Sequence, residues 1–406
     1  MVERPQLSVV TYRKGMYVIL EGNRDSDRFF IVQSGNIQLS RKGETLLQEL
    51  NSSLLSAGDF FGIVSSMAQK RQIETAQAMT DVTLIAVNRA QFDGLIQFNT
   101  PIAMKIIQQF SRRMRFLNSQ LTSLTLNSVG ETSSAVALFT SAQYYFKQKR
   151  YIISSYAYKR FIQCYPYDSN IEIARQNLEG IKQYDKPNYR TGNAPFVRQY
   201  GDDMPVFVEG ESGDELFIIQ SGSVKITKVI NEEEVMLAVL KSGDIFGEMA
   251  ILESKPRSAN AITYNNAVLM VVQRSNFEGL SATQPQVITR LTQLLAERIW
   301  FSYRQIESAA IKDPVGRCFD CLLINIERAN ISIQSKTSYT FNFGLEELTK
   351  MASIPEHDAK AVCKKVLANE KISISYNKIV VSDVMELVKL SEFYRKTSRG
   401  VVNAVF

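Results

Sequence analysis

The stretch FGEMAILESKPRSA, residues 246–259, decides how the rest of the chain is interpreted. Gly247 lets backbone come close to a ligand, because it has no side chain. Glu248 follows in the expected first turn of a short helix, whose free N–H groups favour an anion. Arg257 offers a planar cation suited to a phosphate, and Ser258 adds a hydroxyl. These groups predict a ribose-phosphate site, and the alternative is an Arg–Glu surface pair on a loop.

This segment resembles the phosphate-binding cassette of cyclic nucleotide-binding domains. The resemblance implies that Glu248 holds the ribose 2′-hydroxyl and that Arg257 pairs with the cyclic phosphate. It implies further backbone or hydroxyl contacts from Gly247, Met249, Ala250 and Ser258. The expected effector is therefore cAMP or cGMP, and the sequence does not choose between them, although Ser258 and Ser302 favour cAMP by resemblance.

Length and composition limit the number of domains and the class of protein that we expect. A chain of 406 residues predicts two or three domains at roughly 150 residues each. With 45% hydrophobic and 22% charged residues, the composition is typical of globular proteins. The sequence has no apolar run of about 18 residues, so we expect no membrane span. No secretory signal is expected at the N-terminus. Few, scattered cysteines fit a reduced, cytoplasmic setting.

Neither metal binding nor catalysis is expected. Cys318 and Cys321 form a CxxC inside a helical apolar pattern without a second pair, so they are interpreted as core residues. His357 is the single histidine, which excludes a histidine-based metal cluster. No nucleophile–base set, metal-ligand set or Walker loop occurs in the sequence, so we do not expect an enzyme. The net charge of +6 permits an acidic partner without requiring one.

The chain contains an internal repeat. Residues 5–90 show short alternating apolar runs, which predict an antiparallel β-barrel or sandwich. VILEG, FIVQSG, GDFFG and QFDGL in this part correspond to VFVEG, FIIQSG, GDIFG and NFEGL about 187 residues later. A long helix with heptad-like spacing follows each copy. Its apolar positions are Ile107, Phe110, Met114, Leu117, Leu121 and Leu124 in the first copy, and Ile288, Leu291, Leu295, Ile299 and Ile306 in the second.

The two copies are not equivalent. Phe61-Gly62 leads to Ile63 where the second copy has Glu248. With a two-residue insertion in the first copy, Glu74 is predicted to stand where Arg257 does. A carboxylate would repel a phosphate, so the first copy is expected to keep the fold without binding a cyclic nucleotide. A pocket adapted to another ligand is the alternative.

Residues 130–186 separate the copies and have a helical period rich in Tyr and Phe. This part resembles a tetratricopeptide helix pair, with small residues at Ala142 and Ala157. Such repeats need neighbours to bury their faces, so we expect the segment to pack on the flanking modules as a spacer. A peptide-binding groove, and hence a protein partner, is the alternative.

The C-terminal part predicts two short helices and a hairpin. Leu345, Leu348, Met351 and Ala352 mark the first apolar face, and Ala359, Val362, Cys363 and Val366 mark the second. KISISYNKIVV then predicts two strands around a tight turn at Asn377. A helix-turn-helix with a hairpin wing is the pattern of a DNA-binding domain.

From about residue 200 to 390 the chain resembles the Crp/Fnr family of bacterial regulators. The KDPVGR and KIVV segments are the clearest signals beyond the cassette. The resemblance implies that Ser302 and Tyr303 on the long helix contact the purine. The first copy has Leu117 and Asn118 at these positions.

The second short helix departs from that family. Glu356, His357 and Ala361 stand where Crp-like proteins often have an Arg-Glu pair and a second Arg, so the usual operator is not expected. Lys360, Lys364 and Lys365 are expected to meet phosphates. The alternative is a solvated helix face. The predicted DNA contacts are Glu356, His357, Lys360, Lys364 and Lys365.

The predicted fold is α+β: two jelly-roll β-barrel modules with long helices, a helical insert and a winged helix-turn-helix. The predicted domains are residues 1–128, 129–186, 187–310 and 311–406. We expect a cyclic nucleotide-responsive transcriptional regulator that binds double-stranded DNA. A signalling scaffold acting through protein contacts is the alternative. The two long helices predict either a homodimer or an intrachain pseudo-dimer.

Overall fold

The computed structural model describes residues 6–41, 54–126, 133–192, 196–230, 232–248, 255–275, 279, 283, 285–334 and 336–398. The chain divides into two compact units. We call residues 1–6, 90–115 and 129–295 the insert unit, and residues 7–89, 116–128 and 296–406 the terminal unit. Each unit is described by itself.

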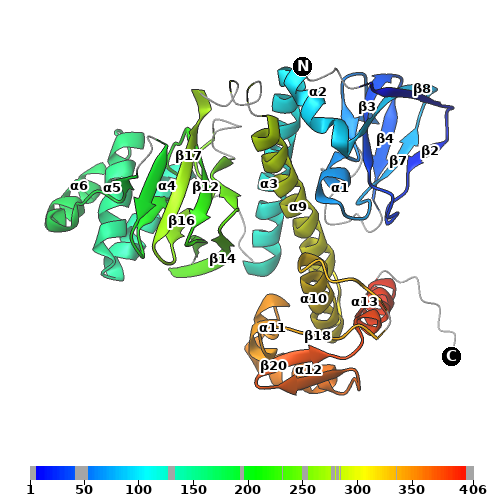
Figure 1. The fold of residues 1–406 in the computed structure, drawn as a ribbon. Helices are drawn as coiled ribbons and strands as arrows, with labels where there is room; N and C mark the ends of the chain where they lie inside the picture. Colours follow the sequence, from blue (N-terminus) through cyan, green and yellow to red (C-terminus); the bar gives the residue numbers. More distant parts are fainter. Residues whose placement is uncertain are drawn as a thin grey trace. The chain divides into compact units, whose positions relative to one another are not determined.

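The second repeat copy, called the second module, is a β-sandwich within the insert unit (Figure 1). One sheet has the order β15-β12-β17-β10-β9 and the other β11-β16-β13-β14. Aromatic side chains such as Phe207, Phe217 and Phe246 fill the space between them. The strands are β9 (Arg190–Thr191), β10 (Val197–Tyr200), β11 (Pro205–Phe207), β12 (Glu215–Ser221), β13 (Ser223–Ile230), β14 (Glu233–Lys241), β15 (Ile245–Phe246), β16 (Asn260–Thr263) and β17 (Ala267–Gln273).

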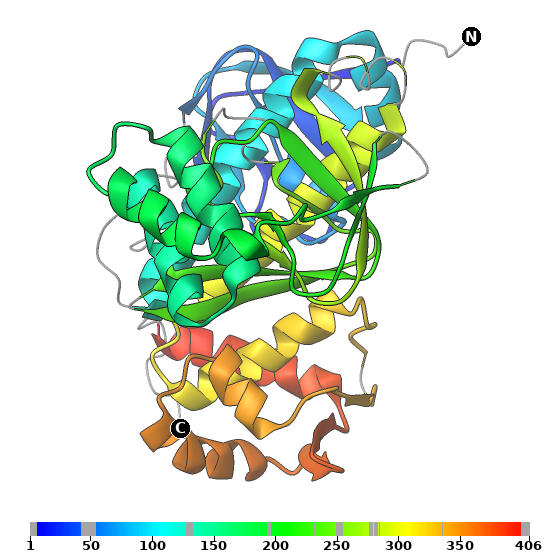
Figure 2. The same ribbon diagram turned by 90° about the vertical axis from the view of Figure 1, so that its left-hand side faces the viewer.

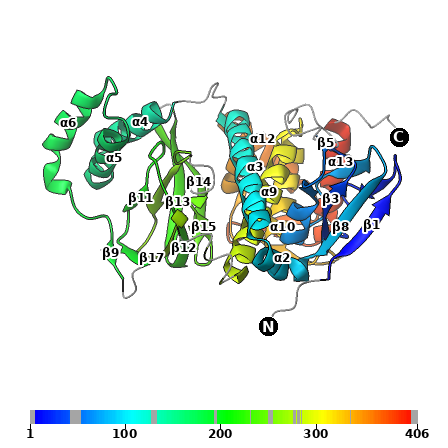
Figure 3. The same ribbon diagram turned by 90° about the horizontal axis from the view of Figure 1, so that it is seen from above.

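The helical insert packs on this sandwich, as Figures 2 and 3 show. It comprises α4 (Ser134–Lys147), α5 (Tyr151–Cys164), α6 (Ile171–Gly180) and η4 (Lys182–Tyr184). Ala142 and Ala157 are fully buried, as their small size predicts, and allow α4 and α5 to pack closely. Val208 and Ile262 of the module belong to the same apolar core, so the insert buries its face on the second module.

The long helices are α3 (Thr100–Leu126) and α9 (Pro285–Ala309), with η3 (Arg89–Gln91) and α2 (Phe92–Phe98) preceding α3. Ile107, Phe110, Met114 and Leu117 of the predicted seam are buried. Leu121 is half-buried, and the side chain of Leu124 lies outside the described residues. Within the insert unit, the Thr289 hydroxyl donates to the Asp93 carboxylate, so α9 is tied to α2 in the same chain.

The first repeat copy, called the first module, lies in the terminal unit. Its sheets have the orders β1-β8-β3-β6 and β2-β7-β4-β5, so the module is a sandwich. The prediction of closed barrels is wrong for the described residues of both modules, because no strand ladder joins the two sheets. The elements are β1 (Ser8–Tyr12), β2 (Tyr17–Ile19), β3 (Arg28–Ser34), β4 (Ile37–Ser40), β5 (Leu54–Leu55), β6 (Phe60–Phe61), α1 (Ile63–Ala68), β7 (Thr75–Ala78) and β8 (Val82–Asn88).

The C-terminal part forms one core from helices and a three-stranded sheet of order β18-β20-β19. Tyr376 and Asn377 both have positive φ, which makes the predicted tight turn between two strands. Met351 was predicted to face the core but is 45% exposed, because it lies in the last turn of its helix. The elements are α10 (Pro314–Arg328), β18 (Tyr339–Thr340), α11 (Leu345–Met351), α12 (Glu356–Leu367), β19 (Ile372–Ser375), β20 (Lys378–Val381) and α13 (Val384–Ser398).

A buried ion cluster joins three helices of the terminal unit. Arg304 of α9 donates from Nη1 to Glu307 at 2.9 Å and from Nε to Glu327 of α10 at 3.0 Å. Arg395 of α13 donates to Asp320 of α10 at 2.6 Å. The end of α9 is therefore held to α10 and α13 by charged contacts, since Arg395 of α13 also pairs with Glu307 at 3.5 Å. No described helix is long and apolar enough to cross a membrane.

Candidate nucleotide-binding site

Arg257 lies at the centre of the predicted cassette and is 6% exposed. Its Nη1 donates to the Gly247 carbonyl oxygen at 2.6 Å, and its Nη2 donates to the Glu215 carbonyl oxygen at 2.8 Å. The guanidinium carbon lies 4.2 Å from the Phe207 ring centre. The buried Nε has no hydrogen-bond partner among the described residues. The guanidinium is thus fixed in place, with its Nε–H unused by those residues.

The backbone of Arg257 is fixed as well. Its N–H donates to the Glu211 carbonyl oxygen at 2.8 Å, and the Gly210 N–H donates to the Arg257 carbonyl oxygen at 2.9 Å. This reciprocal pair joins the segment that precedes β16 to the turn at residues 210–213. The position of the guanidinium therefore depends on that turn.

Two glycines make room for the guanidinium. A Cβ at Gly247, whose φ is +78°, would lie 2.7 Å from Arg257 Nη1. A Cβ at Gly213 would lie 2.5 Å from Arg257 Nη2. The sequence argument found Gly247 and missed Gly213, because the glycine lies far from the cassette in the chain.

Burial and nearby carboxylates act on the pKa of the Arg257 guanidinium in opposite directions. Burial lowers the pKa of Arg257, while the acidic groups Glu211, Glu215 and Glu248 act in the opposite direction. Glu248 is buried and begins the helical segment after Gly247, as predicted. Because a guanidinium keeps its proton even when buried, the site presents a desolvated cation.

Glu211 is a site residue that the sequence argument missed. It is buried, and burial raises the pKa of its carboxyl, while Arg160 and Arg257 act in the opposite direction. Tyr156 O–H donates to Oε1 at 3.1 Å, and Arg160 Nε donates to Oε2 at 3.2 Å. Both partners come from α5 of the insert. In the repeat, Glu211 stands where the first copy has Asn23, and this difference was the available sequence signal.

The other residues predicted to contact the ligand lie in both compact units or outside the described residues. Ser258 follows Arg257 and is half-buried. Met249 and Ala250 lie outside the described residues. Ser302 and Tyr303 are buried in the terminal unit, where the Arg41 guanidinium carbon lies 3.6 Å from the Tyr303 ring centre. Their contact with a purine in the second module stays a prediction.

The predicted alignment of the first copy is wrong. Gln72, not Glu74, corresponds to Arg257: its N–H donates to the Asn23 carbonyl oxygen at 2.7 Å, and the Gly22 N–H donates to the Gln72 carbonyl oxygen at 2.8 Å. The strand registers of β4 with β7 and of β13 with β16 agree with this assignment. No insertion is needed, so a neutral amide replaces the cation in the first module. Glu74 corresponds to Ala259 and is buried.

The predicted DNA-contacting residues all lie on α12 and are exposed: Glu356, His357, Lys360, Lys364 and Lys365. Val362 and Val366 are buried on the other side of the helix. Glu356, Lys360 and Lys364 are spaced four apart and therefore share one face. The N-terminal turn of α12 is acidic and its C-terminal turn is basic.

Comparison with known proteins identifies the two modules. The cyclic nucleotide-binding domain family matches residues 9–99 and 197–284. A cyclic AMP receptor protein of Thermus thermophilus is 33% identical over 127 residues, which cover 31% of this chain and 59% of that protein. A CRP-like cAMP-activated global transcriptional regulator of Mycobacterium tuberculosis is 25% identical, over 45% of this chain and 83% of the regulator.

The cGMP-dependent protein kinase egl-4 of Caenorhabditis briggsae is also similar, with 27% identity over 66% of this chain. The match spans only 27% of the kinase. The catabolite activator protein structure from Thermus thermophilus is 22% identical over 51% of this chain and 92% of that chain, with a TM-score of 0.28. The chain carries two cyclic nucleotide-binding domains, at residues 9–99 and 197–284.

Proposed function

We propose that this chain is a cyclic nucleotide-responsive transcriptional regulator that binds its effector, cAMP, in the second module and binds double-stranded DNA. The observation that carries the effector site is the buried Arg257, whose Nε has no partner among the described residues. A cyclic phosphate oxygen would supply an acceptor for this Nε–H. The named activity of the two CRP-like relatives supports cAMP over cGMP.

In this proposal each cassette residue has one role. Arg257 pairs with the cyclic phosphate, and Glu248 accepts from the ribose 2′-hydroxyl. Gly247, Met249, Ala250 and Ser258 line the phosphate. Binding then shifts a conformational equilibrium, with a coupling of about 1–3 kcal/mol, or ~5–150-fold in DNA affinity.

The first module is proposed to act without a nucleotide. Gln72 provides no charge for a phosphate, and its Nε2 already donates to the Asp25 carbonyl oxygen at 3.0 Å. Protein contacts hold this module to the long helix instead: Trp300 Nε1 donates to the Arg71 carbonyl oxygen at 2.9 Å. The first module would therefore support α9 permanently, as a ligand-independent partner within the chain.

The DNA-binding part is proposed to be α11, α12 and the β19–β20 hairpin, used as a winged helix-turn-helix. The exposed Lys360, Lys364 and Lys365 support phosphate contacts. Glu356 at the helix start is an acceptor, which suits a cytosine amino group rather than guanine. The operator is thus expected to differ from that of regulators that use arginine at this position.

The chain is proposed to pair its long helices internally. The Thr289–Asp93 hydrogen bond supports this, because it joins α9 to α2 of the same chain. One C-terminal domain per chain then remains, so two chains are expected on a palindromic operator. The role is proposed to be regulatory, with no catalytic activity of the chain itself.

A second candidate is a cyclic nucleotide-binding scaffold that acts through protein contacts. The acidic first turn of α12, with Glu356 and Asp358, favours it, because such a turn repels the DNA backbone. The extent of the match to a cGMP-dependent protein kinase shows that similar modules occur in proteins other than bacterial regulators.

Selection of a random-sequence duplex library on the full chain, with and without cAMP, separates these functions. A regulator enriches one motif, more strongly with cAMP, and its affinity falls steeply with salt. A scaffold binds cAMP in calorimetry while enriching no motif under either condition. Without cAMP binding in calorimetry, neither candidate holds.

A further inference from the structure

We propose that the helical insert is a positioning part of the nucleotide site, because Tyr156 and Arg160 of α5 hold the turn at residues 210–213, which in turn fixes Arg257. This inference rests on the proposed cyclic nucleotide binding by the second module. It assigns to the insert a role in ligand affinity, beyond that of a spacer or a surface for partner proteins.

The insert holds the turn through three side chains, two on α5 and one, Tyr165, directly after its end. Tyr156 donates a hydrogen bond to one carboxylate oxygen of Glu211, and Arg160 donates to the other. Arg160 Nη2 also donates to the Ser212 carbonyl oxygen at 2.8 Å. Tyr165 O–H donates to the Gly210 carbonyl oxygen at 2.7 Å. The side chain of Glu211 and two backbone carbonyl groups of the turn are therefore fixed by the insert.

The turn, held by the insert, restricts the position of Arg257 in two ways. The reciprocal backbone pair joins Arg257 to Gly210 and Glu211. The missing side chain at Gly213 gives the guanidinium its space, since a Cβ there would lie 2.5 Å from Nη2. A shift of the turn by a fraction of an ångström would move the guanidinium against Gly213. Phosphate affinity depends on such placement, because a bidentate or charge-assisted contact has strict geometry.

The first module provides an internal comparison. It has the same backbone pair between its turn and Gln72, but Asn23 replaces Glu211. Asn23 is exposed, whereas Glu211 is only 3% exposed. The copy that carries the arginine is thus the copy whose turn is covered by α5. The coincidence supports a functional link between the insert and the cation.

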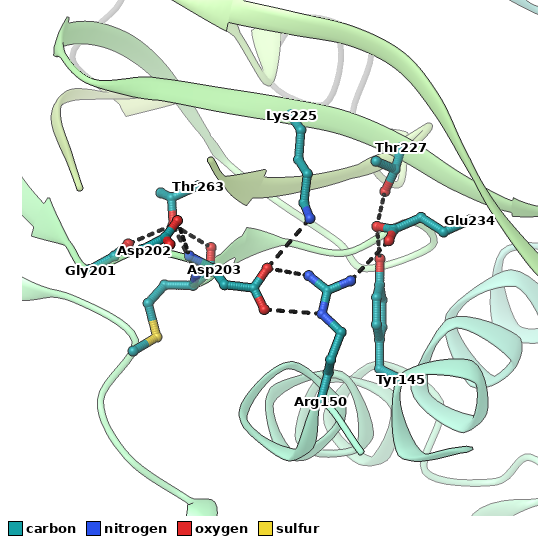
Figure 4. A network of polar contacts seen from close by, with 10 residues as sticks. Tyr145, Arg150, Gly201, Asp202, Asp203, Lys225, Thr227, Glu234 and Thr263 are labelled. Atoms are coloured by element: carbon teal, nitrogen blue, oxygen red, sulfur yellow. Dashed lines mark hydrogen bonds and ion pairs between the residues drawn. The ribbon is translucent and has the colours of Figure 1, made fainter. Parts of the chain in front are cut away.

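A second anchor of the insert offers a matched control (Figure 4). Tyr145 O–H donates to Glu234 Oε1 at 2.9 Å, and Arg150 Nη1 donates to Glu234 Oε2 at 2.9 Å. As at Glu211, one tyrosine and one arginine of the insert hold one glutamate of the module. Glu234 lies on β14, and its described hydrogen bonds lead to Thr227 and not to the Arg257 turn.

The experiment is calorimetric titration of the full chain with cAMP, comparing wild type, Tyr156→Phe and the control Tyr145→Phe. Tyr156 acts on Arg257 only through the turn, so only part of the free energy of its hydrogen bond reaches the site. We therefore expect about 3–10-fold weaker cAMP binding for Tyr156→Phe. Tyr145→Phe is expected to change the affinity less than about twofold, while the two variants lose similar thermal stability. Arg160→Gln, compared with Arg150→Gln, repeats the test with the second side chain.

A double-mutant cycle distinguishes positioning from a general structural effect. In an Arg257→Lys background, adding Tyr156→Phe is expected to weaken cAMP binding by less than about twofold. The guanidinium group that Tyr156 helps to position is absent from that background. Equal affinities of Tyr156→Phe and Tyr145→Phe would overturn the inference, as would an undiminished effect in the Arg257→Lys background. If the wild-type chain binds neither cAMP nor cGMP, the proposed function itself fails, and this inference fails with it.

Discussion

The guanidinium carbon of Arg41 lies 3.6 Å from the ring centre of Tyr303. Arg41 follows β4 of the first module, and its Nε also donates to the Ile73 carbonyl oxygen at 2.6 Å. Arg41 therefore contacts both the long helix α9 and the segment of the first module that corresponds to the cassette. A planar guanidinium stacked on Tyr303 occupies one face of a ring that the sequence assigned to a purine.

Replacing Arg41 tests whether this contact stabilises the terminal unit. Arg41→Ala removes a partly buried cation–π contact of about 0.5–2 kcal/mol and a charge-assisted hydrogen bond. We expect the free energy of unfolding to fall by about 1–3 kcal/mol in urea titrations. Arg24→Ala, at an exposed position of the same module, is the control. Equal unfolding free energies for the two variants would exclude a bridging role of Arg41.

Glu307 gives the terminal unit a defined pH dependence. Burial acts to raise its pKa, but Arg304, Arg41 and Arg71 outweigh burial and lower the pKa below its ordinary value of 4.5. Between the folded-state pKa and about 4.5, the folded chain therefore binds fewer protons than the unfolded chain. The contribution of Glu307 to stability is present above about pH 4.5 and is lost as the pH falls through the folded-state pKa.

Glu307→Gln measures this contribution. At pH 7 we expect the variant to be about 1.5–3 kcal/mol less stable, since a hydrogen bond to a charged group is lost. The difference between wild type and variant in urea unfolding is expected to shrink as the pH falls below 4.5. A difference that stays constant from pH 7 to the acid range would show that the charge of Glu307 does not contribute. Asp320 does not mimic this effect, because burial raises its pKa.

The cysteines are expected to differ in reactivity. Burial raises the pKa of the Cys318 and Cys321 thiols to about 12 each, so neither forms a thiolate at neutral pH. Cys164 and Cys363 are partly exposed. A thiol reagent at pH 8 is predicted to modify Cys164 and Cys363 in the native chain, and all four cysteines in urea. Native labelling of Cys318 or Cys321 would contradict their assignment as core residues.

The α12 lysines are expected to act on DNA through charge alone. Lys364→Ala combined with Lys365→Ala removes up to two phosphate contacts. The slope of log K against log salt is then expected to lose about 0.9 per contact, with the selected motif unchanged. Fluorescence anisotropy at several salt concentrations measures the slope. Lys182→Ala on the insert is the control, and a double variant with the wild-type slope would remove α12 from the DNA interface.

Local pattern and the repeat were sufficient to predict the sandwich strands and the long helices. The roles of Gly247, Glu248 and Arg257, which the resemblance implies, stay predictions. The alignment of Glu74 with Arg257 was wrong because it assumed a two-residue insertion, whereas backbone hydrogen bonds show that Gln72 holds the position. A periodic pattern carries no information about which distant turn a side chain reaches. The contact of Tyr156 with Glu211 therefore could not be predicted.

The central claim is that one pocket per chain, in the second module, binds a cyclic nucleotide through Arg257. Calorimetric titration of wild type and Arg257→Ala with cAMP and cGMP tests it most directly. The account predicts one site per chain in wild type, and a loss of about 10-fold or more in affinity for Arg257→Ala, as expected for a charge-assisted contact. Two sites per chain, no heat with either nucleotide, or unchanged affinity of Arg257→Ala would contradict it.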